Sequence, residues 1–163
     1  MKQEKVILNI LFNDTNISYF KILGGTMEIF KCLNEENLDD FLKDFNFETL
    51  DLGDEEGNTY LHKLVQIKNI YGIEVFADLG ANVNAKNKKG NTPAHIAVEI
   101  DDSKIFEILM DYGADLEIRN NSQRTPKQIA GINNRREILQ IISNCDGDYG
   151  YTEKIKSHRK LED

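Results

Sequence analysis

The 163-residue sequence has only two cysteines and two prolines, contains no tryptophan, and lacks the usual signatures of catalysis. Cys32 and Cys145 lie far apart, with no CxxC or histidine-paired spacing around them, so we expect two unpaired thiols and a reducing compartment. No run of residues approaches the roughly 18 apolar residues that cross a membrane. Walker-type loops and the GxSxG and HExxH motifs are also absent, so the sequence predicts no enzyme, no cofactor and no metal site.

Positive charge is scarce as well, because 20 Lys and Arg residues stand against 28 Asp and Glu residues, for a formal net charge of −8. This balance argues against a general nucleic-acid binder, whose affinity comes mostly from neutralised phosphates. The acidic surplus is concentrated in residues 34–56, which hold ten acidic residues and Lys43 as the one base. The C-terminal third is rich in Lys and Arg instead, so the two ends of the chain differ in charge.

One pattern recurs along the chain at a fixed spacing. Thr59, Thr92 and Thr125 are 33 residues apart, and Gly80 and Gly113 are separated by the same interval. The stretch around Thr92 reads G-N-T-P-A-H-I-A, and parts of it return on both sides in register. The chain is therefore predicted to be a repeat protein.

Each unit of this repeat has the signals of a helix start and a helix end. Threonine before an apolar-periodic run is typical of an N-cap, and Pro93 and Pro126 then occupy the first helical position, where a missing N–H costs nothing. Tyr60 takes that place in the earlier unit. Gly80 and Gly113 follow apolar runs, where a helix commonly ends on a residue with positive φ. A β-branched replacement there is expected to cost at least about 1 kcal/mol.

The period of 33 residues and the T-P-x-H-x-A reading resemble the ankyrin repeat. This resemblance implies an all-α solenoid of about three to four helix-turn-helix units with β-hairpin loops. We place the repeat domain at residues 26–143, after an N-terminal extension at 1–25 for which two roles stay open, a helical cap on the stack or a part of the binding surface. A charged flexible tail follows at 144–163. The predicted units are 26–53, 54–86, 87–119 and 120–143, with atypical, capping units at both ends.

The predicted core lies on one face of each helix. Small residues at Ala94 and Ala97 let neighbouring helix pairs approach closely, and Ser103 is predicted as the N-cap of a second helix. The core residues expected in the last three units are Leu61, Leu64, Val65, Ile73, Val75, Phe76, Leu79, Ala94, Ala97, Val98, Ile105, Phe106, Ile108, Leu109, Thr125, Pro126, Ile129, Ala130, Ile138, Leu139, Ile141 and Ile142.

His62 and His95 are the only pair that could suggest catalysis or metal binding. Their spacing is the repeat period, and in ankyrin repeats this histidine makes structural hydrogen bonds near the start of the first helix. We therefore interpret both as structural, together with the repeat-motif residues Thr59, Gly80, Thr92, Pro93, Gly113, Thr125 and Pro126. Gln128 stands at the same position in the last unit.

The resemblance also implies a binding surface made of the hairpin tips and the outward positions of the first helices. On this chain the tips are residues 54–56, 86–89 and 119–124, so the surface should run from acidic at its N-terminal end to basic at its C-terminal end. A partner with a basic segment would be steered to the acidic end. The predicted partner-binding residues are Asp51, Asp54, Glu55, Glu56, Lys63, Gln66, Lys88, Lys89, Ile96, Glu99 and Asn121.

A short, acidic stack of this kind resembles the IκB-like viral ankyrin proteins (vankyrins) of polydnaviruses. This implies a monomeric protein of the host cytoplasm, or of the nucleus, that binds a Rel/NF-κB transcription factor and suppresses immune signalling. No Asp-Ser-Gly-x-x-Ser degron occurs, since the sequence around Ser103 fails at its third position, and no PEST segment follows Ser143. Such an inhibitor would bind and not be released.

Three alternatives remain from the residues alone. The chain could be a generic ankyrin effector or adaptor for another host protein, an enzyme with catalytic groups outside the repeats, or a fragment of a longer ankyrin protein. Direct contact with nucleic acid or with a membrane is not expected.

Overall fold

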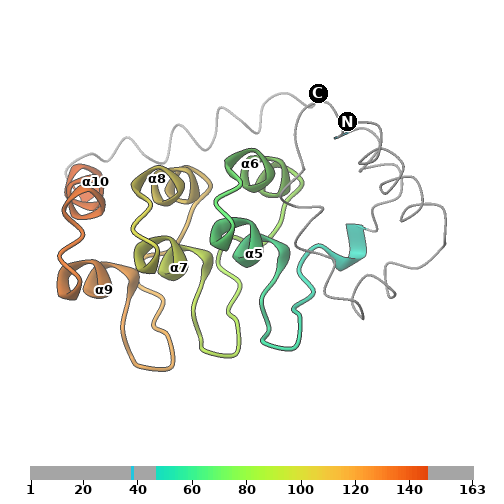
Figure 1. Ribbon diagram of the computed structural model, residues 1–163, viewed down its shortest axis with the longest axis horizontal. Coiled ribbons are helices and arrows are strands. Elements are labelled where there is room, and N and C mark those ends of the chain that lie inside the picture. Colours follow the sequence, from blue (N-terminus) through green and yellow to red (C-terminus); the bar gives the residue numbers. More distant parts are fainter. Residues whose placement is uncertain (1–37, 39–46, 147–163) are drawn as a thin grey trace.

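The structure, a computed structural model, describes residue 38 and residues 47–146. In these residues a short 3₁₀ helix, Phe47–Thr49, precedes six α-helices arranged as three pairs in a row (Figure 1). The pairs are α5 (Tyr60–Gln66) with α6 (Ile70–Asp78), α7 (Pro93–Glu99) with α8 (Ser103–Asp111), and α9 (Pro126–Ile132) with α10 (Arg136–Asp146).

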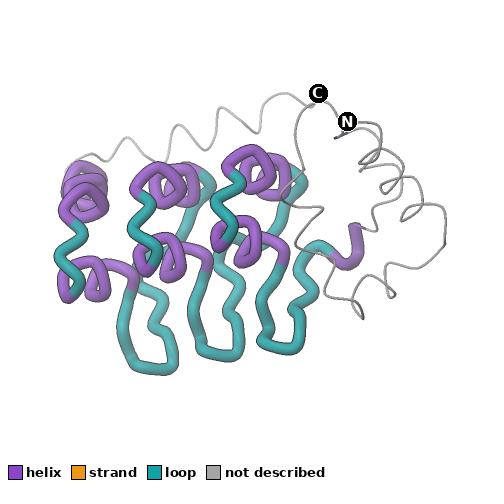
Figure 2. The backbone as a smooth tube through the Cα atoms, viewed as in Figure 1, coloured by secondary structure: helices purple, strands orange, loops and turns teal. Residues whose placement is uncertain are grey.

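These helix pairs confirm the predicted all-α solenoid. No residue in 47–146 is in a strand, and long loops that project to one side connect successive pairs (Figure 2). The predicted extension at 1–25, most of the predicted unit 26–53 and the tail beyond 146 lie outside the described residues, as does Cys32. The division into domains therefore stays a prediction.

The first helix of each pair starts directly after a threonine of the repeat. Thr59, Thr92 and Thr125 are the N-caps of α5, α7 and α9, and each has an extended backbone with ψ between 161° and 174°. Pro93 and Pro126 are the first residues of α7 and α9, where their fixed φ suits the helix. Each of these helices is seven residues long, so tertiary packing must stabilise them.

The second helices start on a different kind of cap. The side chain of Asn69 accepts a hydrogen bond from the N–H of Gly72 at 2.8 Å, and Asp102 accepts one from the N–H of Ile105 at 3.1 Å. The sequence analysis predicts Ser103 as the cap of α8, and this is wrong by one residue. Ser103 is the first residue of α8, and its hydroxyl donates to a Glu137 carboxylate oxygen at 2.8 Å.

The second helices end on the glycines of the repeat. Gly80 and Gly113 have φ of +89° and +85°, a conformation that costs a residue with a Cβ about 1–2 kcal/mol. A Cβ added at either glycine would meet nothing within 4 Å. Backbone conformation, and not lack of space, is therefore what favours glycine at these two positions.

The loop position held by Gly57 and Gly90 offers a direct test of this strain. Both glycines have positive φ, and Gln123 takes the same position in the last unit with φ +59°. Gln123→Gly is therefore expected to raise the free energy of unfolding by up to about 1 kcal/mol, measured by urea denaturation. Ser122→Gly is the control, because Ser122 is a neighbouring exposed residue without positive φ, and this change should not stabilise the protein.

The core runs without interruption through the three pairs. Within each pair the two helices pack together, and α7 also packs on α5 and α9, while α10 packs on α8. Phe76 and Phe106, the two largest fully buried side chains, are 0% exposed and lie on the second helices. Each pair therefore buries its apolar surface against its neighbours, as expected of a solenoid.

The last pair presents a more polar face than the pairs before it. Leu61 and Ala94 are each 1% exposed, and Lys127, at the same repeat position in α9, is exposed. Positions that are buried between pairs thus carry polar or small residues in α9, against which no further pair packs among residues 47–146. Two more positions differ in this way: Val65 and Val98 correspond to Gly131, and the buried His62 and His95 correspond to the exposed Gln128.

Candidate functional site

Three hairpin loops project in a row from one side of the helix pairs (Figures 1 and 2). We call residues 54–58, 87–91 and 120–124 the first, second and third tip. In each tip the N–H of the first residue donates to the carbonyl of the fifth residue at 3.0 Å. The three tips therefore share one closed conformation.

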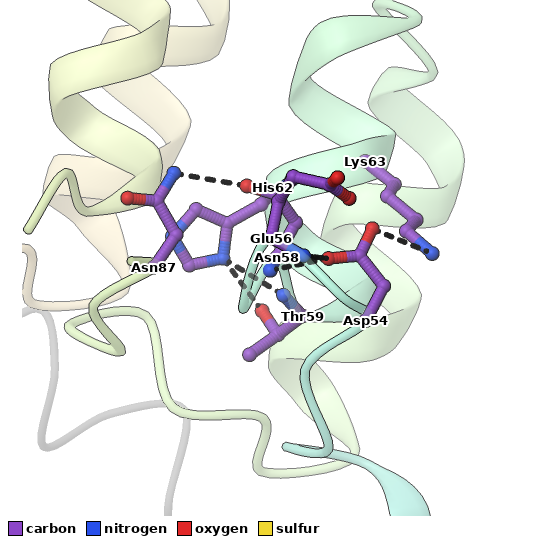
Figure 3. Close-up of polar contacts among 7 residues, drawn as sticks. All are labelled: Asp54, Glu56, Asn58, Thr59, His62, Lys63 and Asn87. Carbon is purple, nitrogen blue, oxygen red and sulfur yellow. Dashed lines mark hydrogen bonds and ion pairs between the residues drawn. The ribbon is translucent and has the colours of Figure 1, made fainter. Parts of the chain in front are cut away.

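The first residue of each tip also closes it with its side chain. One carboxylate oxygen of Asp54 accepts hydrogen bonds from the N–H groups of Glu56 and Asn58, at 3.0 and 2.8 Å (Figure 3). Asn87 and Asn120 make the same two bonds in the second and third tips with their amide oxygens. An acceptor oxygen at this position satisfies two backbone donors of the turn.

Neighbouring tips are joined to one another through their backbones. The N–H of Lys88 donates to the carbonyl of Glu56 at 2.8 Å, and the N–H of Asn121 donates to the carbonyl of Lys89 at 3.0 Å. The side-chain amide of Asn121 adds a bond to the Lys88 carbonyl at 2.8 Å. The backbones of neighbouring tips are thus bonded into one continuous row.

The sequence analysis does not predict a row of asparagines within the tips. The amide of Asn87 donates to Asn58 at 2.9 Å, and the amide of Asn120 donates to Asn91 at 2.9 Å. The signal was present in the spacing, because Asn58 and Asn91 are 33 residues apart, as are Asn87 and Asn120. These side chains stabilise the row of tips.

His62 connects the first unit to the second. Its Nδ1 lies 3.1 Å from the backbone nitrogen of Thr59 and 2.9 Å from the threonine hydroxyl (Figure 3). Its Nε2 lies 2.9 Å from the carbonyl oxygen of Asn91. Since the carbonyl can only accept, Nε2 carries the proton, and Nδ1 is the acceptor for the Thr59 N–H. The bonds fix the neutral ring in one tautomer and occupy both nitrogens.

His95 repeats this arrangement one unit later. Its Nδ1 lies 3.1 Å from the backbone nitrogen of Thr92, and its Nε2 lies 3.0 Å from the carbonyl oxygen of Arg124. Burial lowers the pKa of His62 and of His95, although the hydrogen bonds to carbonyl oxygens oppose the shift. Both rings are 0% exposed. These two histidines are buried between units, where both ring nitrogens are hydrogen-bonded.

Both carboxylate oxygens of Asp54 have partners within the protein. Its second carboxylate oxygen lies 3.2 Å from the Lys63 ammonium, with side-chain exposures of 22% and 15% (Figure 3). Burial would raise the pKa of Asp54, but the Asn58 N–H and then the Lys63 charge outweigh it and hold the pKa below its usual value. The predicted partner-binding pair Asp54 and Lys63 is thus largely neutralised internally.

Several other predicted contact residues are also engaged, and one is buried. The prediction that Ile96 faces outward is wrong, since its side chain is 5% exposed and belongs to the core. Asp51 accepts a hydrogen bond from the N–H of Asn82 at 2.8 Å, and Glu99 accepts one from the Asn91 amide at 3.2 Å. Both keep exposed surface, but their geometry is set by the loops.

The remaining predicted contact residues are exposed on the surface of the stack. Glu55 and Glu56 lie on the first tip, and Lys88 and Lys89 lie on the second tip beside them. Gln66 is exposed at the end of α5. The charge therefore changes sign between the first tip and the second, which are joined by the hydrogen bond from the Lys88 N–H to the Glu56 carbonyl.

A family model described as ankyrin repeats in three copies matches residues 61–152, which is more than half of the chain. The chain belongs to the ankyrin-repeat family. A search of curated proteins found no match. Ankyrin repeats are protein-interaction modules, and their helix pairs and loops present extended binding surfaces. The resemblance to vankyrins has no support from these comparisons.

The ankyrin units show no metal centre in the part of the chain that can be described. No group of three or more His, Cys, Asp or Glu side chains gathers in residue 38 or residues 47–146 in a way that could hold an ion. Within the same ranges, no helix has the length and apolar character needed to cross a bilayer. Cys145, at the end of α10, is a free, half-buried thiol.

Proposed function

We propose that this ankyrin protein is a non-enzymatic, IκB-like inhibitor that binds a Rel/NF-κB factor in the host cytoplasm through its row of tips. Membership of the ankyrin family supports a protein partner. The resemblance to vankyrins and the acidic N-terminal end of the surface favour a Rel protein, whose nuclear-localisation segment is basic.

The observation that carries the proposal is the exposure of two acidic side chains, Glu55 and Glu56, on the first tip. Both side chains are exposed, and neither has an ion-pair partner among the described residues. The closed tip fixes the backbone that carries them, so binding costs little further backbone entropy, and the remaining cost is that of ordering the two side chains. A basic segment laid along the first tip would bring Lys or Arg side chains to both carboxylates.

The proposed inhibitor would not be released by signalling. The sequence around Ser103 lacks the glycine of the degron, and the Ser103 hydroxyl is bonded to Glu137 at the start of α8. A kinase would therefore find a helical, hydrogen-bonded serine in place of an extended degron. Binding without release would keep a Rel protein in the cytoplasm.

Reversing the two free charges is expected to weaken binding of a purified Rel protein by about 10–100-fold, because close charge pairs at interfaces are each worth on the order of 1 kcal/mol or more. The change is Glu55→Lys with Glu56→Lys, and calorimetric titration at near-physiological salt measures the affinity. The matched control is Glu74→Lys with Glu107→Lys, which alters the net charge equally at exposed positions on α6 and α8.

Each of the three outcomes of this comparison decides a different point. Selective loss in the Glu55 and Glu56 variant supports the placement of the basic segment. Equal affinity of both variants and the wild type would rule out that placement. If the folded wild-type protein does not bind the Rel protein at all, the Rel assignment falls, and an ankyrin adaptor for another host protein takes its place.

A further inference from the structure

The second and third tips carry positive charge that no acidic side chain in the described residues neutralises. Lys88, Lys89 and Arg124 are exposed. The cations that form ion pairs between described residues all lie elsewhere. The sequence contains no Asp or Glu in residues 82–98 or 118–134, so no acidic residue within either segment offsets these charges.

Two further cations support the tips without losing their charge. The Lys86 ammonium donates to the backbone carbonyl of Arg119 at 2.8 Å, and the Arg119 guanidinium donates to the carbonyl of Gln123 at 3.0 Å. Both acceptors are neutral, so the positive charge remains on the surface. Like charges held together in this way repel one another, and an acidic partner would relieve the repulsion.

The backbone bonds between tips place this basic region directly beside the acidic one. Lys88 is bonded to Glu56 through the main chain, and Asn121 continues the row from Lys89 to the third tip. The surface therefore changes sign once along its length. A nucleic acid is a poor fit, because its uniformly negative backbone would be repelled at Glu55 and Glu56 and by the net charge of −8.

We propose that the second and third tips bind an acidic, extended polypeptide segment. The row of tips then recognises a partner whose charge changes from basic at the first tip to acidic at the other two. This deepens the proposed function and rests on it in placing a protein partner on the tips. It does not require that the partner be a Rel protein.

The test uses the full chain and two labelled peptides of the same composition. One has four Lys-Ser dipeptides followed by four Glu-Ser dipeptides, and the other alternates Lys-Ser with Glu-Ser. Fluorescence anisotropy at low and near-physiological salt should show the two-block peptide binding about tenfold more tightly, because only that peptide matches both signs at once. Lys88→Glu with Lys89→Glu should remove this preference.

The matched control is Lys104→Glu with Arg136→Glu, which changes the net charge equally at exposed positions on the second helices. It should leave the preference within about twofold, since charges far from a contact are screened. Equal binding of the two peptides to the wild type would overturn the proposal, as would an equal loss in the control variant. Tighter binding of a single-stranded oligonucleotide than of the two-block peptide would also overturn it.

Failure of this proposal can be told apart from failure of the proposed function. If the protein prefers the two-block peptide but does not bind a Rel protein, the acidic subsite is supported and the Rel assignment is wrong. A chain that binds a Rel protein equally well with and without Lys88→Glu and Lys89→Glu keeps the assignment and loses the acidic subsite.

Discussion

Replacing Phe106 with alanine is expected to lower the free energy of unfolding by about 3–5 kcal/mol, as for other fully buried aromatic side chains. Phe106 is 0% exposed on α8, in the middle pair, and belongs to the core cluster that runs through all three pairs. Marginal stability is about 5–15 kcal/mol for a domain, so this loss would unfold a large fraction of molecules under mild denaturant. Urea denaturation followed by circular dichroism measures the change.

Leu139→Ala is the matched control, because Leu139 holds the same repeat position in α10 and is half-buried. Its loss should be about half as large, since less apolar surface leaves water there on folding. Similar losses at both positions would contradict the expectation that the cost follows burial, since Phe106 is 0% exposed and Leu139 is half-buried.

Acid is expected to destabilise the protein through His62 and His95, starting near their unfolded pKa of 6.5. The folded pKa values are lowered, so as the pH falls below this value the unfolded chain takes up protons that the folded chain does not. Stability therefore decreases, by at most about 1.4 kcal/mol per pH unit for each histidine, until the folded pKa is reached. A proton on Nδ1 would face the Thr N–H, a donor against a donor.

The chain itself offers a control that cannot titrate. Gln128 stands at the histidine position in α9, where its side-chain oxygen lies 3.1 Å from the backbone nitrogen of Thr125. The variant with His62→Gln and His95→Gln should lose about 1–2 kcal/mol at neutral pH, because glutamine fits the buried position less well. Its stability should barely change between pH 6.5 and pH 5. An unchanged pH dependence in this variant would show that other groups are responsible.

The repeat was predictable because its signals are local and recur at one interval. Thr92, Pro93 and Gly113 each act through the backbone of their own loop or helix end, so sequence order is sufficient to place them. Ser103 shows the limit of such reasoning, since Asp102 is an equally good cap and sequence spacing does not separate two adjacent candidates.

The surface was harder to predict than the fold, because exposure depends on contacts between units. Ile96 follows His95 in α7 and was predicted to face outward, but neighbouring residues cover it. Asp54 is predicted to bind the partner, yet Lys63 and two backbone donors engage its carboxylate. The change of charge along the tips was easier to predict, because it depends only on which residues the loops contain.

Within each tip, some residues hold the loop and others are exposed. The side chain of the first residue accepts a hydrogen bond from the N–H of the fifth, and the residues between them differ in charge from unit to unit. Glu55 and Glu56 in the first unit correspond to Lys88 and Lys89 in the second. Partner choice can thus change without loss of the scaffold, as is common for loops on rigid elements.

The most direct test of the proposed inhibition is to follow a Rel protein in insect immune cells that express this chain, after an immune stimulus. The account predicts that the Rel protein stays in the cytoplasm, and that it enters the nucleus normally when the chain carries Glu55→Lys with Glu56→Lys. Normal nuclear entry in the presence of the folded wild-type chain would contradict the account.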